Sequence, residues 1–184
     1  MAKNYVDKCP VLQTERFLLR PLSINDDNEI FLIRSDERVL QYTAMAKALT
    51  IDDAREFIKK IDVGIAEGES FYWAIVYNGK EKLAGTICLW NFDEEKTVAE
   101  IGYALLPEYF GKEIMQEIIP AIISYGFKQL GLQTILGDVH PGNVKSVQLL
   151  KKFGFIPDDQ NKDTHDADVV LYTLSVANWS SSRQ

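Results

Sequence analysis

The chain has 184 residues, of which 46% are hydrophobic and 26% charged, and its formal net charge is −7. This length suits one α/β domain with a sizeable core, and the composition excludes a disordered chain. The acidic balance argues against a nucleic-acid partner, because nucleic-acid binding requires clustered positive charge. We therefore expect a single domain over residues 1–184, with loose tails at 1–10 and 180–184.

Two cysteines, Cys9 and Cys88, are too few and too far apart for a disulfide framework or a metal-binding knuckle. No hydrophobic run approaches the length of a membrane span, and no signal-peptide pattern opens the chain. We expect a cytoplasmic protein without a membrane partner. A disulfide between the two cysteines is the alternative.

Both helices and strands are predicted in the first half of the chain. The segment 16–21 is typical of a strand that proline ends, and hydrophobic spacing predicts a short helix over 25–35. Thr50 can cap a second helix over 52–67. The segments 71–77 and 83–92 are rich in aromatic and β-branched residues, and Asn78-Gly79 begins their link, which predicts an antiparallel hairpin.

The second half alternates strands and helices. Strands are predicted over 98–105, 133–139 and 168–176, and helices over 111–130 and 143–153. Gly131 and Gly154 follow the two helices as stop signals. This mixed order predicts an α/β (α+β) domain in which helices cover both faces of a mixed sheet.

The stretch from Glu100 to Lys112 predicts an anion site. A strand and a tight turn lead to Gly111 at a helix start, where unpaired backbone N–H groups and a partial positive charge attract anions. Glycine lets a phosphate approach the backbone closely, and Lys112 adds a positive charge. Taken alone, the same pattern also fits an ordinary strand-to-helix turn.

A second stretch, from Asp138 to Phe155, opens a helix with polar residues. Asn143 can cap that helix, and Ser146 then lies near its first turn. The alternatives are that Asn143 is a cap only and that Ser146 is a solvated hydroxyl.

Together these stretches resemble the GNAT acetyltransferase superfamily, in its RimJ/RimL branch, whose named members acetylate N-terminal amines of ribosomal proteins. The resemblance covers about 12–179 and rests on the order of several motifs: Thr14-Glu15-Arg16-Phe17-Leu18-Leu19-Arg20-Pro21, Leu83-Ala84-Gly85-Thr86, Glu100-Ile101-Gly102-Tyr103, Pro107-Glu108-Tyr109-Phe110-Gly111-Lys112, and Asn143-x-x-Ser146 with Phe153-Gly154-Phe155.

The family implies a mostly antiparallel sheet of about six to seven strands, flanked by about four helices. Two neighbouring strands splay into a V, and the cofactor strand carries a bulge. It also implies acetyl-CoA as donor and co-substrate, and an amine acceptor that is a peptide N-terminus or a small molecule. A monomer or a homodimer is compatible with the sequence.

The resemblance assigns roles to individual residues. The pantetheine arm would lie on the backbone of Tyr103, Ala104 and Leu105, beside Asn143. The pyrophosphate would meet the N–H groups of Phe110, Gly111, Lys112, Glu113 and Ile114. Ser146 would lie near the sulfur and protonate the leaving thiolate, and Glu100 is the candidate base. The alternative for Glu100 is a salt-bridge partner or an exposed charge.

Two further features of the sequence favour a structural role over a catalytic or metal-binding one. Cys88 lacks a paired histidine, which favours packing over a nucleophilic role. His140 and His165 raise the question of a metal, but His165 stands among Asp163, Asp166 and Asp168 in what we expect to be a solvated acidic loop. We expect no metal.

Four residues depart from the family pattern. Glu113 stands where a small residue is usual and would repel a diphosphate, Met115 and Ile118 also stand where small residues are common, and Pro120 should kink the cofactor helix near Gln116. These changes leave a second hypothesis: a degenerate GNAT fold that binds acyl-CoA or a protein partner without catalysis. The acceptor groove, expected at 35–66 and 157–168, gives no substrate identity.

Overall fold

The computed structural model describes residues 9–158 and 169–181. In this part of the chain one sheet runs in the order β1-β2-β3-β4-β5-β6-β8-β7. All neighbouring strands are antiparallel except β5 and β6, which are parallel. The strands are β1 (Leu12–Gln13), β2 (Phe17–Pro21), β3 (Phe71–Tyr77), β4 (Leu83–Trp90), β5 (Val98–Leu105), β6 (Thr134–Val139), β7 (Ile156–Pro157) and β8 (Val170–Ser175).

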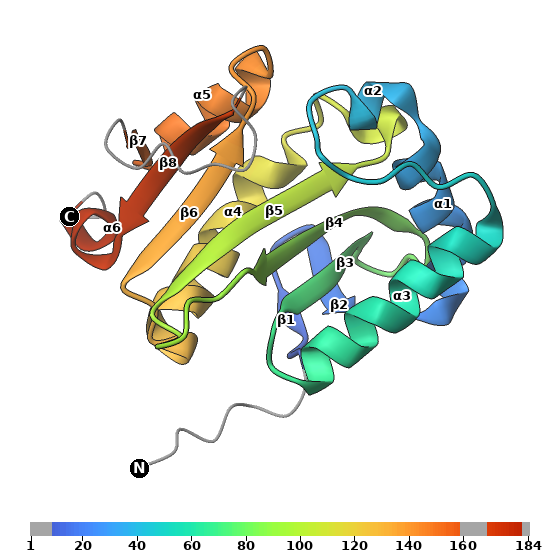
Figure 1. Ribbon diagram of the computed structural model, residues 1–184, viewed down its shortest axis with the longest axis horizontal. Helices are drawn as coiled ribbons and strands as arrows, with labels where there is room; N and C mark the ends of the chain where they lie inside the picture. Colours follow the sequence, from blue (N-terminus) through green and yellow to red (C-terminus); the bar gives the residue numbers. More distant parts are fainter. Residues whose placement is uncertain (1–8, 159–168, 182–184) are drawn as a thin grey trace.

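Helices cover both faces of this sheet (Figure 1). They are α1 (Asp27–Ser35), α2 (Glu37–Leu40), α3 (Ile51–Ala66), α4 (Ile114–Tyr125), α5 (Val144–Lys152) and α6 (Val176–Ser181). No helix among the described residues combines the length and the hydrophobicity that a membrane span requires. The predicted fold class is confirmed.

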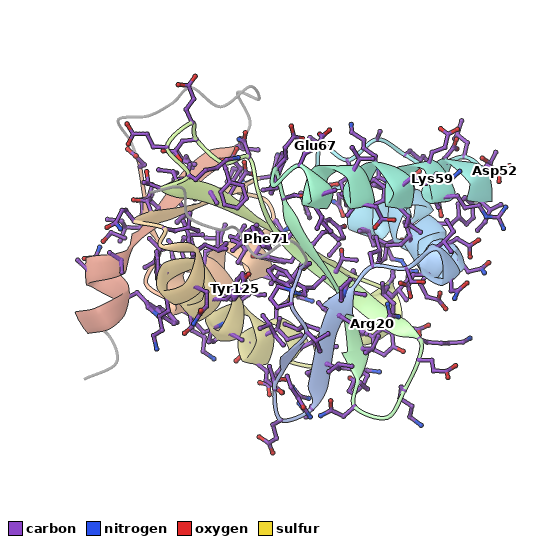
Figure 2. All side chains as sticks on the ribbon, turned by 90° about the horizontal axis from the view of Figure 1, so that it is seen from below. Arg20, Asp52, Lys59, Glu67, Phe71 and Tyr125 are labelled. Atoms are coloured by element: carbon purple, nitrogen blue, oxygen red, sulfur yellow. The ribbon has the colours of Figure 1, made fainter. Side chains whose placement is uncertain are left out.

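Side chains alternate across β3, so that each face of the sheet has its own core. Trp73 and Ile75 pack with α4, whereas Ala74 and Val76 pack with α1 and α3. Figure 2 shows Phe71 of β3 beside Tyr125 of α4, and their ring centroids are 5.8 Å apart. The sheet thus separates a layer containing α1 and α3 from a layer containing α4 and α5.

Most elements lie where the sequence predicts them. Thr50 caps α3 in a reciprocal capping box with Asp53, and Asn143 caps α5 by accepting the Ser146 N–H. The β3–β4 hairpin has its predicted antiparallel pairing. The short elements β1, β7, α2 and α6 add to the predicted set; with two to six residues, they are too short for a hydrophobic period.

Two expectations about backbone geometry are wrong. The helix predicted from residue 111 begins at Ile114, because Gly111 and Glu113 have φ values of 76° and 57° and cannot continue a right-handed helix. The expected bulge of the cofactor strand is absent from the pairing of β5 with β4, which keeps its register. A register shift lies instead between β3 and β4, at Ile75 and Val76.

Strands β5 and β6 part after a short parallel contact. They pair only where Val98, Ala99 and Glu100 face 134–136, and β5 continues to Leu105 without further pairing to β6. Their divergence opens a V whose apex lies at Glu100.

Candidate active site

A cavity of about 920 Å³ lies where β5 and β6 diverge, between the start of α4 and the start of α5. Every residue predicted to contact the donor lines it: Tyr103, Ala104, Leu105, Phe110, Gly111, Lys112, Glu113, Ile114, Asn143 and Ser146. The structure therefore brings together three segments that are up to about 40 residues apart in sequence. Glu100 is the predicted site residue that does not line this cavity.

The turn between β5 and α4 carries the predicted backbone donors, but two of them bond within the turn itself. The Phe110 N–H donates to the Pro107 carbonyl at 3.1 Å and the Lys112 N–H to the Tyr109 carbonyl at 3.4 Å, which leaves Gly111, Glu113 and Ile114 as the donors predicted to face a ligand. A 3₁₀ turn over Pro107–Tyr109 leads to Gly111 and Glu113, both left-handed, and α4 starts at Ile114 without a side-chain cap. The first N–H groups of a helix have no intrahelical partner, and alternating left- and right-handed residues gather such groups into an anion-binding concavity. A Cβ placed on Gly111 meets nothing within 4 Å, so the turn is open to a ligand.

The charges around the cavity suit an anion, although the chain is acidic overall. Of the charged residues in its lining, four are basic and one, Glu113, is acidic; the basic ones are Arg38, Lys112, Lys145 and Lys152. The Lys112 ammonium lies 5.0 Å from the centre of the Tyr109 ring. Backbone donors together with basic side chains are the groups that bind phosphates in proteins. The residues present therefore fit the diphosphate of a coenzyme A thioester.

Ser146, in the first turn of α5, contacts β5 across the cavity. Its hydroxyl lies 2.7 Å from the Tyr103 hydroxyl, in a hydrogen bond that either group can donate. Burial raises the pKa of Tyr103, so the phenol keeps its proton at neutral pH. The pair therefore holds exchangeable protons inside the cavity, at the place where the pantetheine arm is expected.

Glu100 lies at the apex of the V. Residues 100 and 103 are three positions apart on one strand, so their side chains project from opposite faces of the sheet. Burial, and then the negative charge of Asp138, raise the pKa of Glu100 to about 7, against a weaker opposing effect of the Asn91 amide 3.4 Å away. A carboxyl group with this pKa can accept a proton near neutral pH.

The segment around α2 lies within residues 35–66, which the sequence assigned to the acceptor groove, but the structure places part of it in the lining of the donor cavity. Arg38 and Tyr42 line the cavity, and the Tyr42 ring lies 5.3 Å from the His140 ring in the loop before α5. This contact bridges the open end of the V. No local pattern could have revealed it, because it joins residues almost 100 positions apart.

The two cysteines have the surroundings of structural rather than catalytic residues. Cys9 and Cys88 are free thiols, and burial raises the pKa of each to about 12, which agrees with packing rather than nucleophilic catalysis for Cys88. Within 9–158 and 169–181 no three potential metal ligands gather. The expected acidic loop around His165 lies outside the described residues.

The model of the family described as "Acetyltransferase (GNAT) domain" matches residues 16–156. The chain belongs to the GNAT acetyltransferase family. It is 32% identical to "Uncharacterized N-acetyltransferase YoaA" of Bacillus subtilis (strain 168), over 79% of this chain and 82% of that protein. The family assignment and the presence of N-acetyltransferases among its relatives confirm that the GNAT chain is an acetyltransferase.

The RimJ/RimL resemblance agrees with two further similarities. "Putative ribosomal N-acetyltransferase YdaF" of Bacillus subtilis (strain 168) is 30% identical over 59% of this GNAT chain and 61% of its own. The solved structure of ribosomal-protein-S5-alanine acetyltransferase from Vibrio fischeri shares the fold, with a TM-score of 0.77, 21% identity, and coverage of 92% of this chain and 98% of that one.

Proposed function

We propose that this protein transfers the acetyl group of acetyl-CoA to a primary amine by direct attack in a ternary complex. The observation that carries the proposal is the single cavity in which the open amide turn before α4 meets the free edge of β5. A diphosphate on the turn and a pantetheine arm along Tyr103–Leu105 would bring the thioester toward the V.

The two sides of the sheet would then supply the two substrates. The donor enters from the face that carries Tyr103 and Ser146, and the amine reaches the acyl carbon from the face that carries Glu100. Glu100 first takes a proton from the cationic amine, and the freed lone pair of the nitrogen bonds to the carbonyl carbon. The carbon–sulfur bond then breaks, and the nitrogen loses its second proton, which replaces the one that Ser146 gives up. Ser146 gives a proton to the leaving thiolate, and strand N–H groups near Leu105 stabilise the negative oxygen of the tetrahedral intermediate.

The acceptor is an amine of a protein N-terminus or of a small molecule. The surroundings of Glu100 suit a cationic amine because they are acidic and aromatic. They include Asp138 and the half-exposed Trp90, which pairs with Glu100 across β4 and β5. We place the reaction in the cytoplasm, where the free thiols of Cys9 and Cys88 stay reduced.

The donor site can be tested with a pair of matched glycines. Gly111 and Gly79 have φ values of 76° and 73°, and an added Cβ would meet nothing within 4 Å at either. Gly111→Ala and Gly79→Ala should therefore lose similar stability, on the order of 1 kcal/mol. Only the first should weaken acetyl-CoA binding, by tenfold or more in calorimetric titration, because its methyl group would occupy the space of the diphosphate.

The competing function is acyl-CoA or partner binding without catalysis, and the carboxylate of Glu113 beside the amide turn favours it. Free-thiol release from acetyl-CoA with panels of amines and peptides decides between the two. Thiol release with any amine above the amine-free rate supports the enzyme. Tight acetyl-CoA binding with no release for any amine supports the binding protein, and equal binding by both glycine variants contradicts the proposed donor site.

A further inference from the structure

Arg16, in the turn that joins β1 to β2, contacts the backbone of the amide turn from outside the cavity lining. Its guanidinium group donates to the carbonyl oxygen of Lys112 at 3.3 Å and to that of Glu113 at 3.4 Å. These two carbonyls belong to the peptide units that precede Glu113 and Ile114. Arg16 thus contacts the backbone of the predicted diphosphate site although it is not among the residues that line the cavity.

The carboxylate of Glu117, in the first turns of α4, holds Arg16 in place. It accepts hydrogen bonds from the Thr14 hydroxyl at 2.6 Å, the Arg16 N–H at 2.8 Å and the Arg16 Nε at 2.5 Å. Burial raises the pKa of Glu117, but these hydrogen bonds outweigh burial and lower it, so the group stays ionised. The guanidinium is therefore fixed at one end and free to bind carbonyls at the other.

Peptide geometry links the two carbonyls to the amide donors. A trans peptide unit is planar, and its C=O and N–H groups point in opposite directions. When Arg16 draws the carbonyls of Lys112 and Glu113 toward itself, the N–H groups of Glu113 and Ile114 point away from it. These two N–H groups belong to residues that line the cavity.

The left-handed backbone conformation of Glu113 needs contacts that stabilise it. Its φ of 57° is left-handed, and a residue with a Cβ pays on the order of 1–2 kcal/mol there. Such residues persist when their surroundings hold them in place. Glu113 makes no capping hydrogen bond with its own side chain, and its carbonyl accepts the first hydrogen bond of α4. The two Arg16 contacts therefore act together with the helix in fixing the peptide units on both sides of Glu113.

We propose that Arg16 is a positioning residue, which aims the N–H groups of Glu113 and Ile114 at the diphosphate of the acyl donor. The inference rests on the proposed function and adds to it a specific role for a residue distant from the reacting atoms. Arg16 would act on donor binding alone, because it lies outside the cavity that would hold the thioester.

The test compares acetyl-CoA with S-acetylpantetheine, which has the same reacting group but lacks the diphosphate. Arg16→Gln should raise the Kd and KM for acetyl-CoA about tenfold, leave kcat within about twofold, and leave the KM for S-acetylpantetheine unchanged. Glu117→Gln, which weakens the hold on Arg16, should give the same selectivity with a smaller change. Arg16→Lys should restore part of the acetyl-CoA affinity.

Arg55→Gln is the matched control. The side chains of Arg16 and Arg55 are 42% and 46% exposed, and both form carboxylate ion pairs, but Arg55 pairs with Asp27 and Asp52 on the other face of the sheet. This variant should lose stability comparably and bind acetyl-CoA normally. A double-mutant cycle adds a second readout: in the Glu113→Gly background, where left-handed backbone costs nothing, Arg16→Gln should weaken acetyl-CoA binding by clearly less than tenfold.

The outcomes separate the two proposals. Equal weakening of both donors by Arg16→Gln, or unchanged acetyl-CoA affinity, would overturn the positioning role and leave the proposed function standing. Failure of the unaltered protein to bind acetyl-CoA would overturn the proposed function, and the role of Arg16 with it.

Discussion

Replacing Glu100 with glutamine should raise stability and lower activity, both in a pH-dependent way. Its folded-state pKa of about 7 lies above the ordinary value of 4.5. Below pH 4.5 the carboxyl is neutral in both the folded and the unfolded state, so its ionisation does not change the free energy of folding. As the pH rises toward 7, the unfolded chain releases the proton first, so folding becomes progressively less favourable, and the full penalty remains above pH 7.

The size of this penalty follows from the shift of the Glu100 pKa. A change from 4.5 to about 7 corresponds to about 3.4 kcal/mol at 1.36 kcal/mol per pH unit. Because the side chain is only half-buried, solvent screens the charge, and we expect about 1–2 kcal/mol. For a chain of this length that raises the Tm of Glu100→Gln by about 2–8 °C at pH 8. At pH 4.5 the Tm should change little.

Thermal unfolding and kinetics on the same variant complete the test. A lost general base should reduce kcat/KM by about 100-fold at pH 8, and by less at pH 6, where the native carboxyl is mostly protonated. Glu94→Gln, at an exposed carboxylate, is the control and should change neither quantity. A Glu100→Gln variant that is less stable at pH 8 would contradict the raised pKa, and one as active as the native protein would exclude Glu100 as the base.

Substitutions at three further positions probe the donor site and the β4–β5 packing beside it, and Thr50→Ala serves as a control. Glu113→Gly should raise the free energy of unfolding by up to about 1 kcal/mol in urea titrations and tighten acetyl-CoA binding several-fold, since it removes left-handed strain and a carboxylate; weaker binding would contradict this. Asn143→Ala and Thr50→Ala each remove a helix cap and should each cost about 1 kcal/mol in urea, but only the Asn143 variant should weaken acetyl-CoA binding in calorimetry; equal affinities would remove Asn143 from the site. Gly85→Ala puts a Cβ 2.4 Å from the Ala104 carbonyl oxygen and should cost about 1–3 kcal/mol in thermal unfolding together with acetyl-CoA affinity; a neutral variant would contradict the close packing of β4 on β5.

Local patterns predicted most of the fold because they depend on neighbouring residues. The run Phe71–Tyr77 is aromatic or β-branched at every position except Ala74, and β3 has those bounds. Thr50 and Asn143 cap helices through contacts three residues away, which a single sequence displays directly. The residues predicted for the donor site lie together for a different reason: the family resemblance orders motifs along the chain, and the splayed strands bring them to one cavity.

Long-range contacts were beyond the reach of such patterns. The Arg16–Glu117 pair joins residues 101 positions apart, and the contact of Tyr42 with His140 spans almost as many. The left-handed conformation of Glu113 is equally hidden, because sequence favours glycine for such a position. What was missed therefore lies around the site, where tertiary contacts fix the backbone against local preference.

A crystal structure of the protein with acetyl-CoA would show where the diphosphate binds. We expect diphosphate oxygens within hydrogen-bond distance of backbone N–H groups between Gly111 and Ile114, with the thioester directed toward the V between β5 and β6. A diphosphate bound elsewhere, or a Glu113 carboxylate that fills the turn while acetyl-CoA is present, would contradict this expectation.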